Sequence, residues 1–524
     1  MRNPTRQPQF HSRLDVHDRK QFEIKLEYEP SPGQAKAGYL VEAYLFLPAS
    51  LNVDADTYPR QDFYADLLNY VRLKTPVFTF EELLCAPSSP LLEAQRSLSQ
   101  PSLPFQPQII YQAKLLSCVF RGTLRRFTRF LEAQSRELAP LAADPGRSVE
   151  FAEKLRQSMR GMRRILERFR AVNKSLFARD GIEEKTRASA RLVDEYMSLS
   201  VEQLIRKAVT KMGDMPRTGV YAELRRELMN EIVAEGAYRK AGKLRSLLSH
   251  SSDNEEYIHR FGFLKKFCTN ILFLALRRRR RNSLEEVLFA AAAGLAMAFA
   301  TAVAFWAQGR FPQVSLNFFL ILVIGYMMKD RIKEELRRVF ASALKPYLFD
   351  RKSRIIEPVT KKCFGICLEQ VDYRTARGVP EEIIALRRSD DFSTVSQGEL
   401  AETVIHYQKE VRLNSHLLPE RAGVSGVTDI IRLNVERLLR DMDDPECALE
   451  YVDLDDFSVG QIRAAKRYHV DLAFRFSVDR GYSKNVSYRL ARLVLDREGI
   501  NRMIRIQAAA EDLASSTPVR SIAG

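Results

Sequence analysis

The side chains best suited to chemistry form an acidic cluster late in the chain. It consists of two groups of aspartates, Asp441, Asp443 and Asp444, then Asp453, Asp455 and Asp456. Magnesium and calcium prefer carboxylate oxygens, so Asp453, Asp455 and Asp456 are a candidate metal site. The segment lacks the glycine and the distal glutamate of a calcium loop. The competing interpretation is a solvated acidic connection between two elements.

Histidines and cysteines offer little further chemistry. His406 and His469 lie on predicted strands, where they could meet beside Asp471 or Arg475 and exchange protons near neutral pH; as ordinary strand residues they would be exposed. The three-residue gap between Cys363 and Cys367 fits neither a zinc knuckle nor a redox pair, and we interpret both as core residues. Phosphate loops, nucleophile elbows and kinase motifs are absent from the sequence. We therefore expect no cofactor, and the sequence does not indicate an enzyme.

Two uncharged apolar runs, 287–307 and 311–328, stand in the middle of the chain. Each is long enough, as a helix, to cross about 30 Å of hydrocarbon. Only three residues separate them, which predicts a tight transmembrane hairpin. Ala290, Gly294 and Ala298 recur every four residues, as do Ala292, Ala296 and Ala300, and this spacing predicts ridges for close helix packing against the partner helix or another copy. Asn317 could donate a hydrogen bond across that face.

Basic residues flank the predicted hairpin on both sides. Positive residues stay on the cytoplasmic side of a membrane, so we expect both termini in the cytoplasm, with two spans in a bacterial inner membrane. Bases next to a span also attract anionic lipid headgroups, and the residues predicted to do so are Arg277, Arg278, Arg279, Arg280, Arg281, Lys329, Arg331 and Lys333.

The composition is that of a folded protein, with 45% hydrophobic and 28% charged residues in 524. The net charge of +16 could serve nucleic acid or an anionic membrane surface. Much of the excess lies beside the apolar runs, and no aromatic platform accompanies it. We therefore expect the lipid bilayer as a partner, and no nucleic acid.

The first half of the chain divides into four predicted segments. Alternation at Phe22–Tyr28 indicates a half-buried strand, and 39–47 is its predicted partner in a small β-hairpin. Apolar residues spaced four and three apart from Leu155 to Phe169 indicate a heptad seam, packed within the chain or against another copy. The predicted segments are a polar tail at 1–20, a small α+β subdomain at 21–85, a Pro- and Ser-rich loop at 86–107 and a helical, coiled-coil-like region at 108–282.

The second half begins with the predicted transmembrane hairpin. In Tyr468–Val478 every even position is apolar, which indicates a strand with one wet face, and Val486–Leu490 reads as its return strand. We also expect a helix at 429–441. The predicted segments are the hairpin at 283–330, a juxtamembrane helix at 331–350, a β-rich cytosolic domain at 351–510 and a flexible tail at 511–524.

Together these features predict an α+β membrane protein. A two-helix transmembrane hairpin would separate a mainly helical cytosolic region from a mainly antiparallel β domain. The expected function is a membrane-anchored scaffold or sensor that binds an unknown cytosolic protein and assembles through helices, with a second copy as one partner. One alternative is a membrane-bound enzyme with a divalent cation in the β-rich domain. A further alternative is a subunit of an oligomeric transporter or channel.

Overall fold

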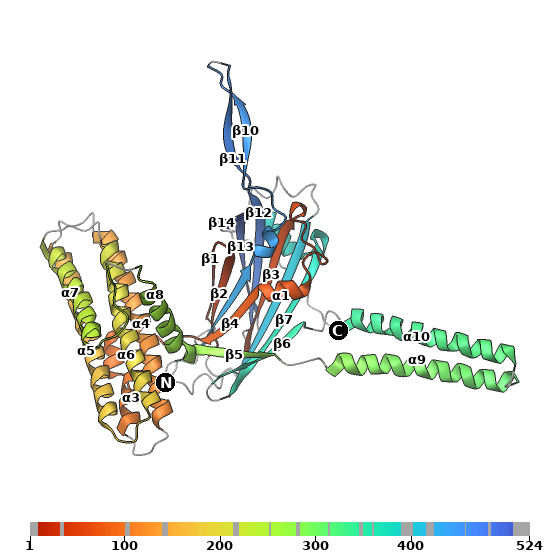
Figure 1. Cartoon of the computed structure of the whole chain (residues 1–524), viewed down its shortest axis with the longest axis horizontal. Coiled ribbons are helices and arrows are strands. Elements are labelled where there is room, and N and C mark those ends of the chain that lie inside the picture. The colour runs from red at the N-terminus through yellow and green to blue at the C-terminus, as the bar shows by residue number, and fades with distance from the viewer. Residues whose placement is uncertain are drawn as a thin grey trace, which may run out of the picture.

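The structure is a computed structural model of the chain, and Figure 1 shows the arrangement of its elements. It describes residues 9–31, 36–99, 105–138, 145–212, 219–250, 253–278, 283–312, 315–344, 349–358, 361–388, 402–414, 424–455, 457–479 and 484–506.

Twelve strands form one antiparallel sheet that is nearly closed into a barrel, with the order β1-β2-β9-β4-β5-β6-β7-β8-β3-β12-β13-β14. We call this sheet the barrel. Its strands come from both ends of the chain: β1 (Gln9–Asp18), β2 (Gln21–Glu29), β3 (Lys36–Pro48), β4 (Leu67–Leu73), β5 (Phe273–Arg278), β6 (Arg351–Ile356), β7 (Cys363–Thr375), β8 (Glu402–Asn414), β9 (Val427–Asn434), β12 (Tyr468–Asp479), β13 (Lys484–Asp496) and β14 (Gly499–Ile506).

The period-two pattern of each strand decides which side chains face the barrel interior. In β2 the even positions Phe22 to Tyr28 are buried and the odd positions are half-buried, as the alternation predicted. The two edge strands, β1 and β14, meet where the backbone N–H of Ile500 donates to the carbonyl of Arg19 at 2.5 Å. The guanidinium of Arg505 adds two bonds to the carbonyl of Leu14, at 3.0 and 2.8 Å. These contacts bridge the remaining gap between the sheet edges.

A helical bundle lies beside the barrel (Figure 1) and comes from the chain between β4 and β5. We call α4–α8 the bundle. The predicted heptad seam lies on α5, and its residues are buried against elements of the same chain, which agrees with packing within one chain. The helices before and within the bundle are α1 (Arg60–Asp66), α2 (Phe80–Cys85), α3 (Pro90–Ser99), α4 (Phe105–Leu138), α5 (Pro145–Ala178), α6 (Glu184–Lys211), α7 (Gly219–Ala241) and α8 (Glu255–Thr269).

Two hairpins leave the body of the molecule (Figure 1). The first consists of helices α9 (Ser283–Arg310) and α10 (Leu316–Leu344), which pack side by side, and we call it the arm. The second consists of strands β10 (Glu446–Val452) and β11 (Val459–Ala465), which pair only with each other, and we call it the ribbon. A short helix, α11 (Glu381–Arg388), covers part of the outer face of the barrel beside β12.

The predicted fold class is wrong in its main division. The chain is an α+β protein, but the expected β-rich cytosolic domain is not separate, because its strands share one sheet with β1–β4. The expected hairpin of Phe22–Tyr28 with 39–47 does not form either. β2 pairs with β1 and β9, and β3 pairs with β8 and β12. Alternation predicts that a segment is a strand, but it carries no information about which other strand has a complementary face.

Three shorter segments also differ from expectation. The predicted polar tail contains strand β1, whose partner is β2. The predicted Pro- and Ser-rich loop contains helix α3, because Pro90 stands at a helix start, where proline costs no hydrogen bond. The predicted helix at 429–441 is instead strand β9 followed by the 3-10 helix Glu436–Leu439. The predicted pairing of Tyr468–Val478 with the next strand is confirmed as β12 with β13.

Candidate membrane-anchoring site

The arm leaves the barrel between two strands that are neighbours in the sheet. β5 precedes α9, β6 follows α10, and these strands pair from Ala275–Ile356 to Arg278–Ser353. Both ends of the arm are therefore tied to the same place. Any path that α9 takes away from the barrel must be retraced by α10, as Figure 1 shows.

The arm carries its large apolar side chains on the outside. On α9 the buried residues are the small Ala292, Ala296 and Ala307, and they face the inside of the hairpin. On α10, Gly325 fits beside Val303, whose Cγ1 would lie 3.1 Å from an added Cβ. The exposed large apolar residues of the arm are Val287, Leu295, Met297, Phe299, Phe305, Trp306, Leu316, Phe319, Leu320, Val323, Ile324, Tyr326, Met327, Met328 and Val339.

One of the two predicted packing ridges is on the opposite side from the helix–helix contact. Ala290, Gly294, Ala298 and Asn317 are exposed, and an added Cβ at Gly294 would meet nothing within 4 Å. The small residues that do meet α10 are Ala292 and Ala296, which belong to the second predicted ridge of α9. Contact of the exposed ridge with another copy of the chain stays a prediction.

Among the described residues, only one of the two predicted spans remains a candidate membrane span. Val287–Arg310 is long and apolar enough to cross a membrane, with a mean hydropathy of 2.1. One such helix is weak evidence, since the core helix of a soluble protein passes the same test. The second predicted span, 311–328, is wrong: α10 begins at Leu316, and Lys329 is the thirteenth residue after it. Thirteen helical residues cover about 20 Å, short of the ~30 Å hydrocarbon core.

The turn between the two helices also differs from expectation. α9 continues to Arg310, so this arginine belongs to the last turn of the helix. Phe311–Ser315 connects the two helices, and the ring of Phe311 lies 6.2 Å from that of Trp306. The tip of the arm therefore combines aromatic rings with a single arginine among the residues that the structure describes.

The predicted basic flanks do not meet at one level of the arm. Arg277 and Arg278 are exposed on β5, at the base. Lys329, whose ammonium lies 3.8 Å from the ring centre of Tyr326, stands near the level of Phe299. Arg331 and Lys333 lie up to one turn further from the tip. Sixteen helical residues, about 24 Å, separate Phe299 from the start of α9. Arg279, Arg280 and Arg281 lie outside the described residues.

The predicted metal site lies at the tip of the ribbon. The backbone N–H of Asp455 donates to the Asp453 carboxylate at 3.0 Å, which closes a turn, and Asp456 lies outside the described residues. Across the described part of the chain, no three His, Cys, Asp or Glu side chains are grouped to hold a metal ion. The neighbouring Leu454 and Phe457 are 81% and 80% exposed. A cation at these aspartates stays a prediction.

The predicted acid–base pair is not assembled. His406 of β8 is level with Ala473 of β12, four residues from His469. The His406 ring instead stacks on Tyr44, with ring centroids 4.5 Å apart. Asp471 was expected on a wet face but is buried, where it accepts bonds of 2.7 Å from both Arg387 of α11 and Arg492 of β13. Burial of Cys367 is confirmed, whereas Cys363 is exposed.

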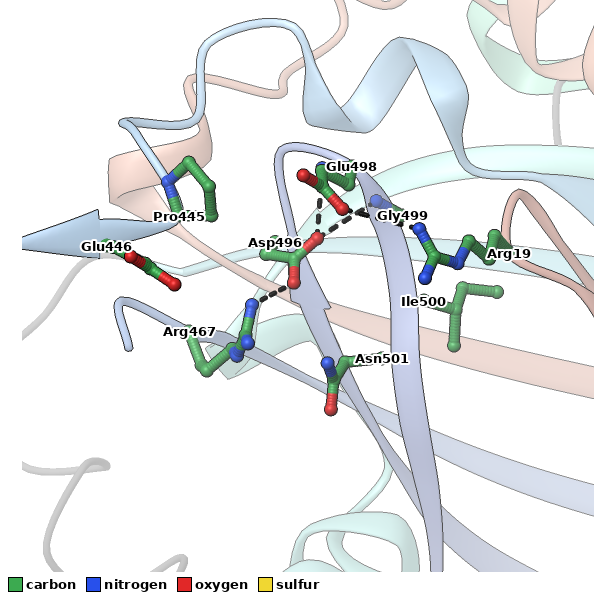
Figure 2. Close-up of a pocket in the computed structure, with 9 residues that line it drawn as sticks. All are labelled: Arg19, Pro445, Glu446, Arg467, Asp496, Glu498, Gly499, Ile500 and Asn501. Carbon is green, nitrogen blue, oxygen red and sulfur yellow. Dashed lines mark hydrogen bonds and ion pairs between the residues drawn. The ribbon is translucent and has the colours of Figure 1, made fainter. Parts of the chain in front are cut away.

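A polar pocket of about 280 Å³ lies at the base of the ribbon, and Figure 2 shows its lining. The Asp496 carboxylate accepts bonds from the backbone N–H groups of Glu498 and Gly499, at 2.9 and 3.1 Å, and pairs with Arg467. Arg19 pairs with Glu498 at 3.3 Å. Both arginines are therefore paired inside the pocket, and the arrangement holds three turns together rather than offering free charges to a ligand.

A second polar network crosses the interior of the barrel. The ammonium of Lys409 lies 2.7 Å from the carboxylate of Asp429, and both side chains are almost fully buried. The hydroxyl of Tyr39 donates to Asp429 at 2.8 Å, and that of Tyr407 donates to Glu369 at 2.8 Å. Burial alone would lower the pKa of Lys409, but the charge of Asp429 outweighs it and raises that pKa. Lys409 therefore stays charged.

The sequence contains a signal for this network, namely charged residues on strand faces that are otherwise apolar, although the motif search does not detect it. Lys409 stands on the same face of its strand as Tyr407, Val411 and Leu413, which alternation marks as apolar. Asp429 likewise stands on the buried face of β9. A charge on an apolar face predicts a buried partner of opposite sign, although the identity of that partner depends on the fold.

Comparisons with protein-family models, curated proteins and solved structures gave no match. The fold and the arm define a class by themselves: an α+β protein with a nearly closed antiparallel barrel that carries an apolar helical hairpin. The evidence for function is therefore the chain's own geometry, and the arm provides its clearest part.

Proposed function

We propose that this protein is a membrane-anchored scaffold and that the arm is its anchor. The supporting observation is the ring of large apolar side chains around the arm. Contact of this surface with water is unfavourable, whereas lipid would solvate it. The common origin of both helices at β5 and β6 supports insertion from one side with return to that side. The arm then acts as a re-entrant hairpin and holds the barrel and the bundle at the membrane surface.

The depth of insertion follows from the shorter apolar segment. Over the last ~20 Å before the tip, Arg310 is the one charged residue in the two helices. This length exceeds one leaflet of about 15 Å but is shorter than the full hydrocarbon core. Arg310 at the tip costs about 2.5–3.5 kcal/mol near the bilayer centre. Ten Leu, Ile, Val and Phe residues in 300–307 and 316–328 favour insertion by ~3–6 kcal/mol in total, which offsets that cost.

The basic residues support the placement of the body. Lys329, Arg331 and Lys333 would meet anionic headgroups where the apolar part of α10 ends. Because bases on that side favour the cytoplasm, the barrel and the bundle would face cytosolic partners. The seam of α5 is already buried in the bundle, so assembly with a partner would use other surfaces than the expected coiled coil.

Cysteine accessibility at the tip tests this topology. The exposed Cys85, Cys363 and Cys447 are first replaced by serine, since the other three cysteines are buried. Gly309→Cys then places one thiol at the tip, where an added Cβ meets nothing within 4 Å. In vesicles with the body outside, a membrane-impermeant maleimide should leave this thiol unlabelled until detergent is added.

The matched control is Arg164→Cys, on an exposed position of α5, which should label fully without detergent. Labelling of the tip from outside would show that the arm stays in water. Labelling by a reagent trapped inside the vesicles would show that the arm crosses completely. Either result contradicts re-entrant insertion.

A further inference from the structure

A group of cations lies where the bundle meets the barrel. The bundle and the arm lie on opposite sides of the barrel (Figure 1). The members of the group are Arg72 of β4, Arg121 and Arg125 of α4, Lys265 of α8 and Arg432 of β9. We call these five residues the junction cluster. Two helices of the bundle and the outer face of the barrel therefore direct positive charge to one place.

The strand register explains how the barrel contributes. Leu68, Tyr70 and Arg72 alternate with the buried residues of β4, so they share its outer face. Arg432 is the register partner of Leu68 on the neighbouring β9. Its guanidinium lies 6.0 Å from the ring centre of Tyr70.

The helices contribute the other three cations. Arg121, Arg125 and Arg129 are spaced by four residues and share one face of α4, although like charges at this spacing destabilise a helix. The Arg121 guanidinium is fixed by a 2.8 Å bond to the Ser200 hydroxyl, and it lies 5.1 Å from the ring centre of Phe261. Phe261 stands one turn before Lys265 on α8.

Carboxylates do not balance this charge. Glu23 pairs with Arg432 at 2.6 Å, and Glu27 is held by Lys25 at 2.6 Å. Among the described residues, Arg72, Arg125 and Lys265 have no ion-pair partner. Burial, and then the four surrounding guanidinium groups, lower the pKa of Lys265. The cations thus repel one another in the folded protein.

Two hydrogen-bond donors in the cluster also lack acceptors. The Nε atoms of Arg72 and Arg121 are enclosed by protein, yet neither has a hydrogen-bond partner in the described structure. An enclosed donor without an acceptor is costly. The cluster therefore has more positive charge and more donors than the neighbouring carboxylates and acceptors balance, and its exposed members Arg125 and Lys265 leave it open to solvent.

We propose that the junction cluster binds an anionic phosphate group. Phosphate oxygens would accept from the exposed guanidinium of Arg125 and the exposed ammonium of Lys265 and would neutralise both, and guanidinium groups suit phosphate because their donors form a planar fork. A free polyphosphate and an anionic lipid headgroup share this chemistry. The site does not depend on the function proposed for the arm.

Titration calorimetry on the full chain in neutral detergent tests the site. The probes are inorganic tripolyphosphate and glycerophosphoglycerol, the soluble headgroup of phosphatidylglycerol. Binding of either probe is expected, and the tighter one identifies the source of the phosphate. Arg125→Gln with Lys265→Gln should weaken binding at least tenfold. The matched control, Arg164→Gln with Lys174→Gln, removes two exposed cations of α5 and should leave binding unchanged.

Thermal unfolding without ligand gives a second, independent measurement. At low salt Arg125→Gln with Lys265→Gln should raise the melting temperature, because it relieves repulsion between cations, and tripolyphosphate should raise that of the parent chain more than that of this variant. Absence of binding by both probes would overturn the proposal. Equal weakening in the control, or tighter binding of a single-stranded oligonucleotide than of tripolyphosphate, would overturn it as well. None of these outcomes depends on whether the arm enters a membrane.

Discussion

The barrel and the arm distribute the same kinds of side chain in opposite ways. In the barrel, Leu472 is fully buried among other apolar residues, and charges such as Lys409 are tolerated inside only with a partner. In the arm, alanines lie inside the helix pair while Leu320 is 46% exposed. The barrel is thus organised for water outside, and the arm for an apolar environment outside. The barrel therefore exposes polar side chains and the arm exposes apolar ones, which fits the lipid environment that we propose for the arm.

The largest effect should come from placing one substitution in both regions. Leu472→Asp buries a carboxylate without a partner, which should cost more than about 4 kcal/mol and unfold the barrel. Leu320→Asp should leave barrel stability in detergent unchanged but weaken membrane binding by ~2.5–3.5 kcal/mol, about a hundredfold. Chemical unfolding and vesicle flotation measure the two effects. Equal loss of barrel stability from both substitutions would break the comparison.

A smaller effect is expected from the charge inside the barrel. Asp429→Asn leaves the Lys409 ammonium buried without its counter-charge, which should cost about 3–5 kcal/mol. The control is Glu410→Gln, at the residue that follows Lys409 in β8. The ion-pair partner of Glu410 is Arg412, which is mostly exposed. Exposed pairs contribute about 0–1 kcal/mol, so this variant should unfold almost like the parent chain. Urea unfolding of both variants checks the difference, and similar midpoints would show that the interior tolerates an isolated charge.

The smallest expected effect is a pH dependence on the outer face of the barrel. Burial of the Glu42 carboxyl would raise its pKa, but the neighbouring His406 ring and the Arg475 guanidinium, at 3.5 Å, outweigh burial and lower that pKa. The group therefore stabilises the fold above its unfolded pKa, and this contribution is lost as the pH falls through the folded pKa.

Glu42→Gln should consequently reduce the loss of stability between pH 7 and pH 3, measured by urea unfolding at each pH. Glu167→Gln, at an exposed position of α5, is the matched control and should retain the acid sensitivity of the parent chain. An unchanged acid profile in Glu42→Gln would show that its ion pairs do not contribute.

Much of the local structure was predictable from the residues, because the spacing of apolar residues differs between strands and helices. The even positions of Tyr468–Val478 predicted β12, and its return strand followed at the expected place. The four-and-three spacing on α5 predicted a buried helix face. By contrast, the residues around Phe63–Leu73 predict a single helix, but the chain changes from helix α1 to strand β4 after Asp66.

The candidate site was predictable in part. The apolar composition of 287–307 identified helix α9, which contains the one candidate membrane span among the described residues. The residues 311–328 have the same composition, yet five of them lie in the connection or before the helix start at Leu316. The junction cluster was not predicted, because its five cations are spread from Arg72 to Arg432 and only the meeting of the bundle with the barrel unites them.

Local pattern alone determined several of the strands and helices, such as β12, β13 and α5, and which helix is apolar enough for lipid, since period and composition act over a few neighbouring residues. Pairing, burial of charge and the meeting of distant cations were decided by the three-dimensional fold. These depend on contacts between residues hundreds of positions apart, such as Tyr39 with Asp429, and no short window of the chain contains both partners.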